Sequence, residues 1–96
     1  MEFRTIQDEV LFEIAKNRKI MTYKEIEKNI KKKFVMKSCA DSLHKRQLAI
    51  REQCFGSDKL GRMNKCSTLR LKRGKMHRIK RILKPYGWQE EWEHDW

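Results

Sequence analysis

The sequence predicts a mainly α-helical domain that carries one small β-hairpin. Three observations lead to this fold class. Apolar residues recur at spacings of three and four through the first half of the chain, which is the period of an amphipathic helix. Thr22 and Glu25 have the spacing of a helix capping box. Apolar and polar residues alternate from Ser67 to Lys72, as in a half-buried strand. At 96 residues, the chain has the length of one domain.

The first two helices have clear start signals. The first is expected to end near Asn17, and Thr5 with Asp8 can cap its beginning. Its apolar stripe consists of Phe3, Ile6, Val10, Leu11 and Ile14. The second begins at Thr22, whose hydroxyl and the Glu25 carboxylate can each bind a free backbone amide of the first turn. Its buried stripe consists of Tyr23, Ile26, Ile30 and Phe34.

A third helix is predicted from Ser38 to about Cys54, with Asp41 supporting a cap at Ser38. Its apolar face follows spacings of three and four and is made of Ala40, Leu43, Gln47, Ile50 and Cys54. Gln47 is the polar member of that face. Leu48 would project outward, so it would need to touch another element, a partner or a thymine methyl group.

The rest of the chain predicts a hairpin and a fourth helix. The strand at Ser67–Lys72 is expected to pair with a preceding strand at Lys59–Arg62, through a turn at Met63–Lys65. The fourth helix runs from Lys75 to Leu83 with a narrow apolar stripe, and Pro85 ends it. That stripe consists of Met76, Ile79, Ile82 and Leu83.

Charge divides the chain into two parts. Residues 1–87 form a basic domain that holds all 24 Lys and Arg residues and nine acids. Between Lys59 and Gly87 there are eleven Lys or Arg residues and no acid. Residues 88–96 form an acidic, Trp-rich tail with four acids and no Lys or Arg. A field this one-sided predicts a polyanionic partner for the domain.

The order helix, capped helix, helix and basic hairpin resembles the winged helix-turn-helix superfamily of DNA-binding domains. The segment Ile20–Ile26 looks like the entry to the second helix of that superfamily, and Ser38–Arg46 looks like the start of its recognition helix. Leu60–Arg73 would be the wing. The resemblance covers residues 3–73. The chain differs from the pattern at Gln47, where the superfamily usually has a buried aliphatic residue.

This resemblance and the charge predict duplex DNA binding, sequence-directed or general, by a small transcriptional regulator or accessory factor of phage-like character. The third helix would enter the major groove, and the hairpin and fourth helix would hold phosphates. The alternative for the third helix is a solvated outer face. The residues predicted to contact nucleic acid are Ser42, His44, Lys45, Arg46, Arg51, Arg62, Lys65, Arg70, Lys72, Arg73, Lys75, Arg78 and Arg81.

The tail allows three interpretations. Trp88, Trp92 and Trp96 are four residues apart and would share one face of a helix. The tail could fold back and complete the core, because Trp is a large apolar residue in a chain with few. It could bind a protein partner or a second copy of this chain through the three Trp residues, or bind a larger nucleic-acid machine. It could also lie on the basic surface and compete with nucleic acid.

Other functions find less support. The sequence has no paired-carboxylate, G-x-S-x-G, phosphate-loop or H-E-x-x-H motif, so we expect no catalysis and no cofactor. RNA binding is a further alternative, but no Phe, Tyr or Trp lies between Lys59 and Lys84 to stack on bases.

The three cysteines, Cys39, Cys54 and Cys66, are odd in number and far apart, and we expect free thiols and no metal site. No stretch free of charged residues exceeds five, so we expect no signal peptide and no membrane span. The expected location is cytoplasmic or nucleoid-associated.

Overall fold

The computed structural model describes residues 3–57 and 63–95, with the backbone alone for 54–57, 63–65 and 95. Over these ranges the chain forms four α-helices and a three-stranded antiparallel sheet, so the predicted, mainly helical fold with a hairpin is confirmed. The helices are α1 (Ile6–Asn17), α2 (Tyr23–Asn29), α3 (Met36–Lys45) and α4 (Met76–Leu83). The strands are β1 (Met21–Thr22), β2 (Ala49–Ser57) and β3 (Met63–Leu71), in the sheet order β1-β3-β2.

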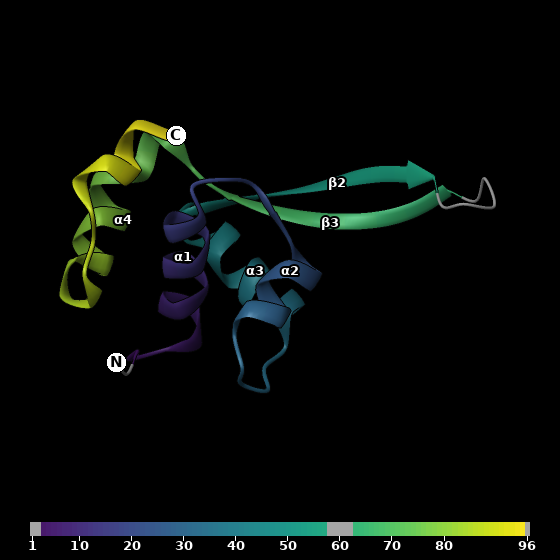
Figure 1. Cartoon of the computed structure of the whole chain (residues 1–96), viewed down its shortest axis with the longest axis horizontal. Coiled ribbons are helices and arrows are strands. Elements are labelled where there is room, and N and C mark those ends of the chain that lie inside the picture. The colour runs from purple at the N-terminus through teal and green to yellow at the C-terminus, as the bar shows by residue number, and fades with distance from the viewer. Residues whose placement is uncertain (1–2, 58–62, 96) are drawn as a thin grey trace.

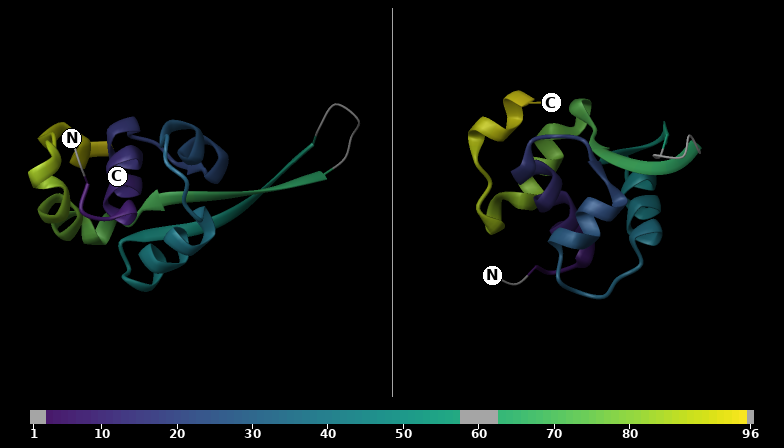
Figure 2. Two further views of the ribbon diagram at one scale, coloured as in Figure 1. Left: turned by 90° about the horizontal axis from the view of Figure 1, so that it is seen from below. Right: turned by 45° about the vertical axis from the view of Figure 1, so that its right-hand side comes forward.

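The four helices form a body from which β2 and β3 extend as a long ribbon (Figure 1). The two further views show the same projecting ribbon, with α4 and the C-terminal segment at the other end of the molecule (Figure 2). The molecule measures 45 × 28 × 23 Å along its principal axes. The core lies between α1, α3, α4 and the helix-facing side of the sheet, where Leu11, Leu43, Leu69 and Ile79 are fully buried.

The start and end of α1 follow from local chemistry, as predicted. The Thr5 hydroxyl accepts a hydrogen bond from the backbone N–H of Asp8 at 3.2 Å, which satisfies one free donor of the first turn. Arg18 ends the helix in the left-handed conformation at φ 57°. Between these ends, Val10 and Ile14 are fully buried.

The predicted capping box of α2 is present. The backbone N–H of Glu25 donates to the Thr22 hydroxyl at 3.1 Å, and that of Thr22 donates to the Glu25 carboxylate at 3.4 Å. The sequence did not indicate that Met21 and Thr22 also form the short strand β1, paired with Leu69 and Thr68 of β3. The cap of α2 is therefore fixed by the sheet as well as by its own hydrogen bonds.

The third helix was predicted in the right place but with wrong ends. It begins at Met36, its N-cap is Val35, and no side chain caps it, so the expected cap at Ser38 is wrong. It ends at Lys45, and the residues from Ala49 onward, predicted as helix, belong to β2. The helical spacing of apolar residues continues past Lys45 only by coincidence. Strand β2 begins soon after the helix ends, and its apolar residues happen to fit the same spacing.

A Schellman motif ends α3. Gln47 has a φ of 60°, in the left-handed region, and its N–H donates to the carbonyl of His44 at 3.0 Å. The N–H of Leu48 reaches back to the carbonyl of Leu43 at 3.1 Å, and both leucine side chains are buried. The prediction that Leu48 projects outward is therefore wrong. Leu48 packs in the core as the apolar contact of this motif.

The hairpin is present with a different register from the predicted one. Ala49 lies opposite Leu71 and Ser57 lies opposite Met63, so the strand that pairs with residues 67–71 is 49–53. The predicted partner strand at Lys59–Arg62 lies outside the described residues. Met63–Lys65, predicted as the turn, are the first residues of β3. The alternation of the second strand was interpreted correctly, but β2 was hidden within the predicted helix.

The cysteines differ from the expectation of free thiols. Cys66 is disulfide-bonded, whereas Cys39 is a buried free thiol whose burial raises its pKa. In the hairpin register the backbone of Cys66 lies opposite that of Cys54. Directly opposite residues of antiparallel strands have Cα atoms about 4.5–5.5 Å apart, within the range of a disulfide. Wide spacing of cysteines along the sequence therefore does not exclude a disulfide.

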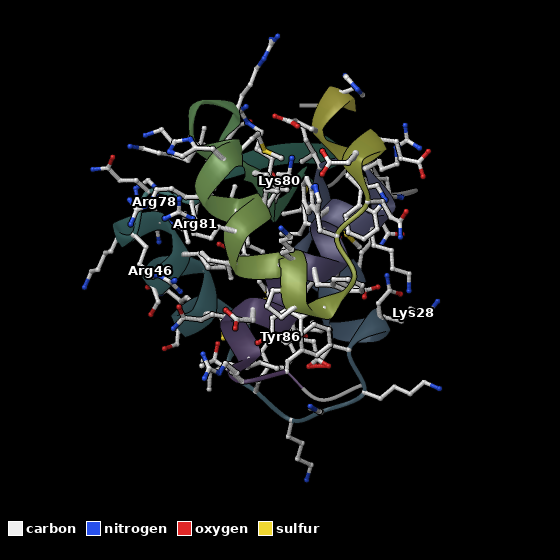
Figure 3. All side chains as sticks on the ribbon, turned by 90° about the vertical axis from the view of Figure 1, so that its left-hand side faces the viewer. Lys28, Arg46, Arg78, Lys80, Arg81 and Tyr86 are labelled. Carbon is white, nitrogen blue, oxygen red and sulfur yellow. The ribbon has the colours of Figure 1, made fainter. Side chains whose placement is uncertain are left out.

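The fourth helix agrees with the prediction, and Tyr86 connects the segment that follows it to α1. Figure 3 shows Arg78 and Arg81 on the side of α4 nearest Arg46. The Tyr86 hydroxyl donates to the Asp8 carboxylate at 2.8 Å and accepts from the backbone N–H of Arg4 at 3.1 Å. The C-terminal segment is thus tied to the start of α1.

The acidic tail folds back on the helical body. Glu90–Asp95 forms a 3-10 helix, so the α-helical face predicted for the Trp residues is wrong. Trp92 is buried, and its ring centroid lies 5.5 Å from that of Phe12 on α1. Trp88 packs edge-on against Trp92 with the centroids 5.3 Å apart, and Trp96 lies outside the described residues. The described Trp residues therefore extend the core.

Candidate nucleic-acid interface

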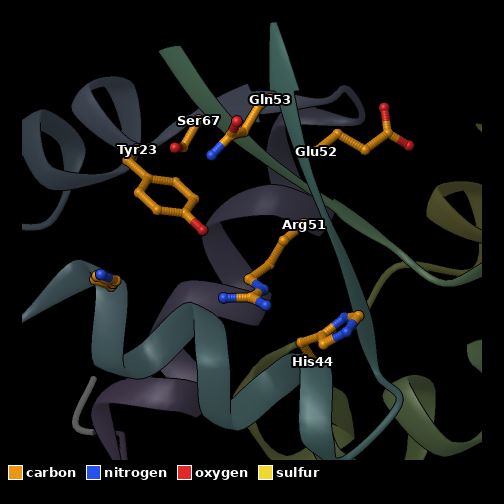
Figure 4. Close-up of a pocket in the computed structure, with 7 residues that line it drawn as sticks. Tyr23, His44, Arg51, Glu52, Gln53 and Ser67 are labelled. Carbon is orange, nitrogen blue, oxygen red and sulfur yellow. The ribbon is translucent and has the colours of Figure 1, made fainter. Parts of the chain in front are cut away.

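A groove of about 470 Å³ lies between α3 and the hairpin, beside the start of α2. Figure 4 shows Arg51 reaching from β2 toward α3, with the Tyr23 ring on one side and His44 on the other. The residues that line this groove, which we call the α3–hairpin groove, are Tyr23, Lys37, His44, Arg51, Glu52, Gln53 and Ser67.

The groove lies along the same face of the hairpin that packs on the helices. Alternate residues of a strand point to the same face, and the register places Ala49, Arg51 and Gln53 on the face that carries Leu69 and Leu71. Ala49 and the two leucines are buried against the helices. Arg51 and Gln53, farther along β2 on that face, are exposed. The same face of the sheet therefore changes from apolar to polar along β2.

Charge in the groove centres on Arg51. Its guanidinium forms an ion pair with the Asp41 carboxylate of α3. Both side chains are about two-fifths exposed, so this pair contributes at most about 1 kcal/mol to stability. Burial raises the pKa of Tyr23; the charge of Arg51 opposes that rise and the charge of Asp41 adds to it. Arg51 keeps donors beyond those that face Asp41, since a guanidinium has five.

Arg70 does not join this groove. It lies opposite Ile50 in the register, on the other face of the sheet, and its Nε donates to the Glu52 carboxylate at 2.8 Å. Figure 4 shows the Glu52 carboxylate pointing away from Arg51 and Tyr23. The strand alternation therefore places Arg51 and Arg70, both predicted to contact nucleic acid, on opposite faces of the sheet.

The predicted contact residues of α3 divide between two sides of the helix end. His44 lies in the α3–hairpin groove, Lys45 is exposed and Ser42 is half-buried. Arg46 is turned toward α1, where its guanidinium donates to the Gln7 side-chain oxygen at 2.8 Å. The end of α3 therefore presents basic side chains in two directions.

The acid-free segment is partly covered by the acidic tail. Lys72, Arg73 and Lys75 lie where β3 leads through a 3-10 turn (Arg73–Lys75) into α4. Arg73 shares a groove of about 290 Å³ with Glu93 of the tail. The Lys80 ammonium lies 2.7 Å from the Glu90 carboxylate, and this hydrogen bond raises the pKa of Lys80.

Two predicted contact residues have no described side chain. Arg62 is outside the described residues, and Lys65 is described by its backbone alone. Arg78 and Arg81 are exposed on α4, at the end of the molecule opposite the hairpin (Figures 1 and 3). A partner contact through the Trp residues stays a prediction, with Trp92 taken up by the core of its own chain.

Five groove residues were missed from the sequence: Tyr23, Lys37, Glu52, Gln53 and Ser67. Gln53 and Ser67 could have been found by alternation if residues 49–57 had been recognised as a strand. Lys37 could have been found from a helix that begins at Met36, because positions 37, 41 and 44 then share one face. No local pattern indicated Tyr23, which was predicted as a core residue.

The described part of the chain holds no group of three His, Cys, Asp or Glu side chains able to bind a metal ion. Among the same residues no helix is both long and apolar enough to span a bilayer. Comparison with models of known families, with curated proteins and with solved structures finds no match for this chain.

Proposed function

We propose that this protein binds duplex DNA as a winged-helix-like domain, with α3 in the major groove and the hairpin along the backbone. A small transcriptional regulator or accessory factor would need no more than this. Support comes from the order of the elements, which is the helix, capped helix, helix and hairpin of the superfamily that the sequence resembles. α3 has ten residues and is about 15 Å long, a length suited to the major groove.

The α3–hairpin groove is the observation that carries the proposal. Lys37 and His44 of α3 face Arg51 of β2 across it. The acids near these residues are already engaged, because Asp41 pairs with Arg51, and Glu52 pairs with Arg70 on the other sheet face. A polyanion entering the groove therefore meets basic side chains and few unpaired carboxylates.

Affinity and specificity would come from different parts of this surface. The chain has a formal net charge of +11, and each phosphate contact releases counterions, so binding would be strong at low salt and weaken steeply as salt rises. Specificity would rest on α3, whose side chains can reach base edges.

The double substitution Lys37→Gln/Arg51→Gln tests the proposal. It removes two positive charges from the groove. For duplex DNA we therefore expect the negative slope of log K against log salt to become shallower by about 1.8. Fluorescence anisotropy with a labelled duplex across a salt series measures this slope. Circular dichroism checks that the variant is folded.

The matched control is Lys28→Gln/Lys31→Gln, which removes the same charge from exposed positions at and beyond the end of α2. Figure 3 shows Lys28 on the opposite side of the view from Arg46, Arg78 and Arg81. Its slope should change much less than that of the groove variant. Equal changes in the two variants, or a wild-type protein that does not bind duplex at low salt, would refute the proposal.

Tyr23 favours single-stranded nucleic acid as a second candidate ligand. Its half-buried ring lies in the groove beside Arg51, where a base could stack on it. Base stacking on an aromatic ring contributes about 1–3 kcal/mol. Tighter binding of single-stranded RNA or DNA than of duplex, lost in Tyr23→Leu, would establish this candidate in place of the first.

A further inference from the structure

A second groove, of about 920 Å³, lies on the other side of the α3 end. Three segments that are far apart in the sequence form it: the start of α1, the end of α3 and the end of α4 with Tyr86. Each segment supplies one arginine, namely Arg4, Arg46 and Arg81. Figure 3 shows Arg46 and Arg81 on the same side of the molecule. We call this the three-arginine groove.

The acid of this groove is already satisfied. Asp8 is only 9% exposed, and its carboxylate accepts the Tyr86 hydroxyl at 2.8 Å. The same hydroxyl accepts the backbone N–H of Arg4 at 3.1 Å, which fixes the chain at the first arginine. The buried carboxylate therefore serves to position the groove, and all three arginines are exposed at its opening.

The guanidinium of Arg46 is held in place and still has donors to offer. One of its five N–H groups donates to the Gln7 oxygen at 2.8 Å, so the others are available to a ligand. The first turn of α1, with Thr5 and Gln7, also lines the groove. A helix N-terminus carries partial positive charge and favours an anion beside it. Arginine forks match the oxygens of a phosphate group better than any other side chain.

We propose that the three-arginine groove binds a backbone phosphate of the same duplex that occupies the α3–hairpin groove. This inference rests on the proposed function. His44 lines the first groove and Arg46 the second, so the two sites flank one helix end two residues apart. A duplex lying on α3 reaches both. Arg78, one turn before Arg81 on α4, extends the basic surface along the same backbone.

The test is the double substitution Arg46→Gln/Arg81→Gln, compared with Lys28→Gln/Lys31→Gln, in duplex binding across a salt series. Two phosphate-facing charges are lost, so the negative slope of log K against log salt should become shallower by about 1.8 relative to the wild-type chain. Arg81→Gln alone leaves the Arg46–Gln7 hydrogen bond in place and should lower the slope by about 0.9. Circular dichroism and thermal melting show whether each variant is folded.

The outcomes separate this inference from the proposed function. If the wild-type protein binds duplex and both arginine variants keep its slope, the phosphate site is wrong and the proposed function stands. If the arginine variants lose slope while Lys37→Gln/Arg51→Gln does not, the three-arginine groove contacts duplex by itself, and both the α3–hairpin contact and the shared duplex are refuted. Binding of inorganic phosphate to the wild-type groove, with unchanged duplex affinity in the variants, would assign it to a small phosphorylated ligand and overturn the duplex contact.

Discussion

Gln47 shows how much one backbone conformation decides in this chain. Its φ of 60° lets the chain leave α3 and enter β2 within three residues. An L-residue in the left-handed region costs about 1–2 kcal/mol, because Cβ approaches the backbone carbonyl oxygen. Glycine, which avoids this cost, is the usual residue at this position of a Schellman motif. The missing glycine is why the sequence did not indicate the end of the helix.

We expect Gln47→Gly to stabilise the protein. The gain from relieving the left-handed strain exceeds the entropy that glycine loses on folding, leaving about 0.5–1 kcal/mol in the free energy of unfolding. Urea denaturation measures it. Gln47→Ala is the control, since alanine keeps the Cβ and should bring no such gain. A glycine variant less stable than the wild-type chain would contradict the assigned conformation.

At the scale of the element, α2 is a seven-residue helix whose stability depends on its first turn. So short a helix is not stable alone and needs its cap and its packing. The Glu25 carboxylate lies 3.2 Å from the Lys19 ammonium and also accepts the Thr22 N–H. The Lys19 interaction, followed by the Thr22 N–H, holds the pKa of Glu25 below its ordinary value of 4.5.

This lowered pKa predicts an acid-dependent loss of stability. A group whose pKa is lower in the folded state stabilises the protein above its unfolded pKa, and that contribution disappears as pH falls through the folded pKa. Glu25→Gln should therefore show a smaller loss of stability below pH 4.5 than the wild-type chain, in melting temperatures measured across pH. Thr22→Ala should cost about 1 kcal/mol at neutral pH. Parallel pH profiles for wild type and Glu25→Gln would exclude the role of the carboxylate.

The elements that could be predicted are those whose ends carry side-chain chemistry. Thr5 and Thr22 mark the starts of α1 and α2, and Pro85 stops the helical pattern after α4. α3 has no side-chain cap at its start and ends in a Schellman motif that lacks the usual glycine, so neither end carries a residue that marks it in the sequence. β2 was missed because Ile50 and Cys54 fit a helical period as well as a strand, and only pairing with β3 decides between the two.

At the scale of the whole molecule, aromatic rings join the two ends of the described chain across α1. Phe3 lies 4.7 Å from Tyr86 and 5.3 Å from Phe12, measured between ring centroids. Phe12 contacts Trp92, which contacts Trp88. Such pairs contribute about 0.5–1.5 kcal/mol each beyond the apolar area that they bury. The tail therefore stabilises the fold, whatever else it does.

Trp92→Ala should destabilise the protein by about 3–5 kcal/mol, the range for removing a buried large aromatic side chain. Trp88→Ala is the matched control and should cost less, because Trp88 is only half-buried. Chemical denaturation of both variants measures the difference. Equal, small effects of the two substitutions would mean that the tail does not complete the core and would favour the interpretation as a partner-binding segment.

The candidate site could be predicted only in part, because it is a property of the assembled molecule. The basic character of the segment after Lys59 was evident, and so was the exposed side of α3. The separation of Arg70 from Arg51, however, follows from strand alternation in a hairpin whose register was not known. The meeting of Arg4, Arg46 and Arg81 requires α1, α3 and α4 to be packed, and no spacing in the sequence indicates it.

The bond between Tyr86 and Asp8 also has a consequence for the order in which the protein is made. α1 is synthesised about seventy residues before its partners, so its Asp8 carboxylate and its Phe12 ring receive Tyr86 and Trp92 only after residues 86–92 have left the ribosome. Domains generally fold as units during synthesis. Part of the apolar surface of α1 therefore stays open to water until the segment that carries Tyr86 and Trp92 has been made.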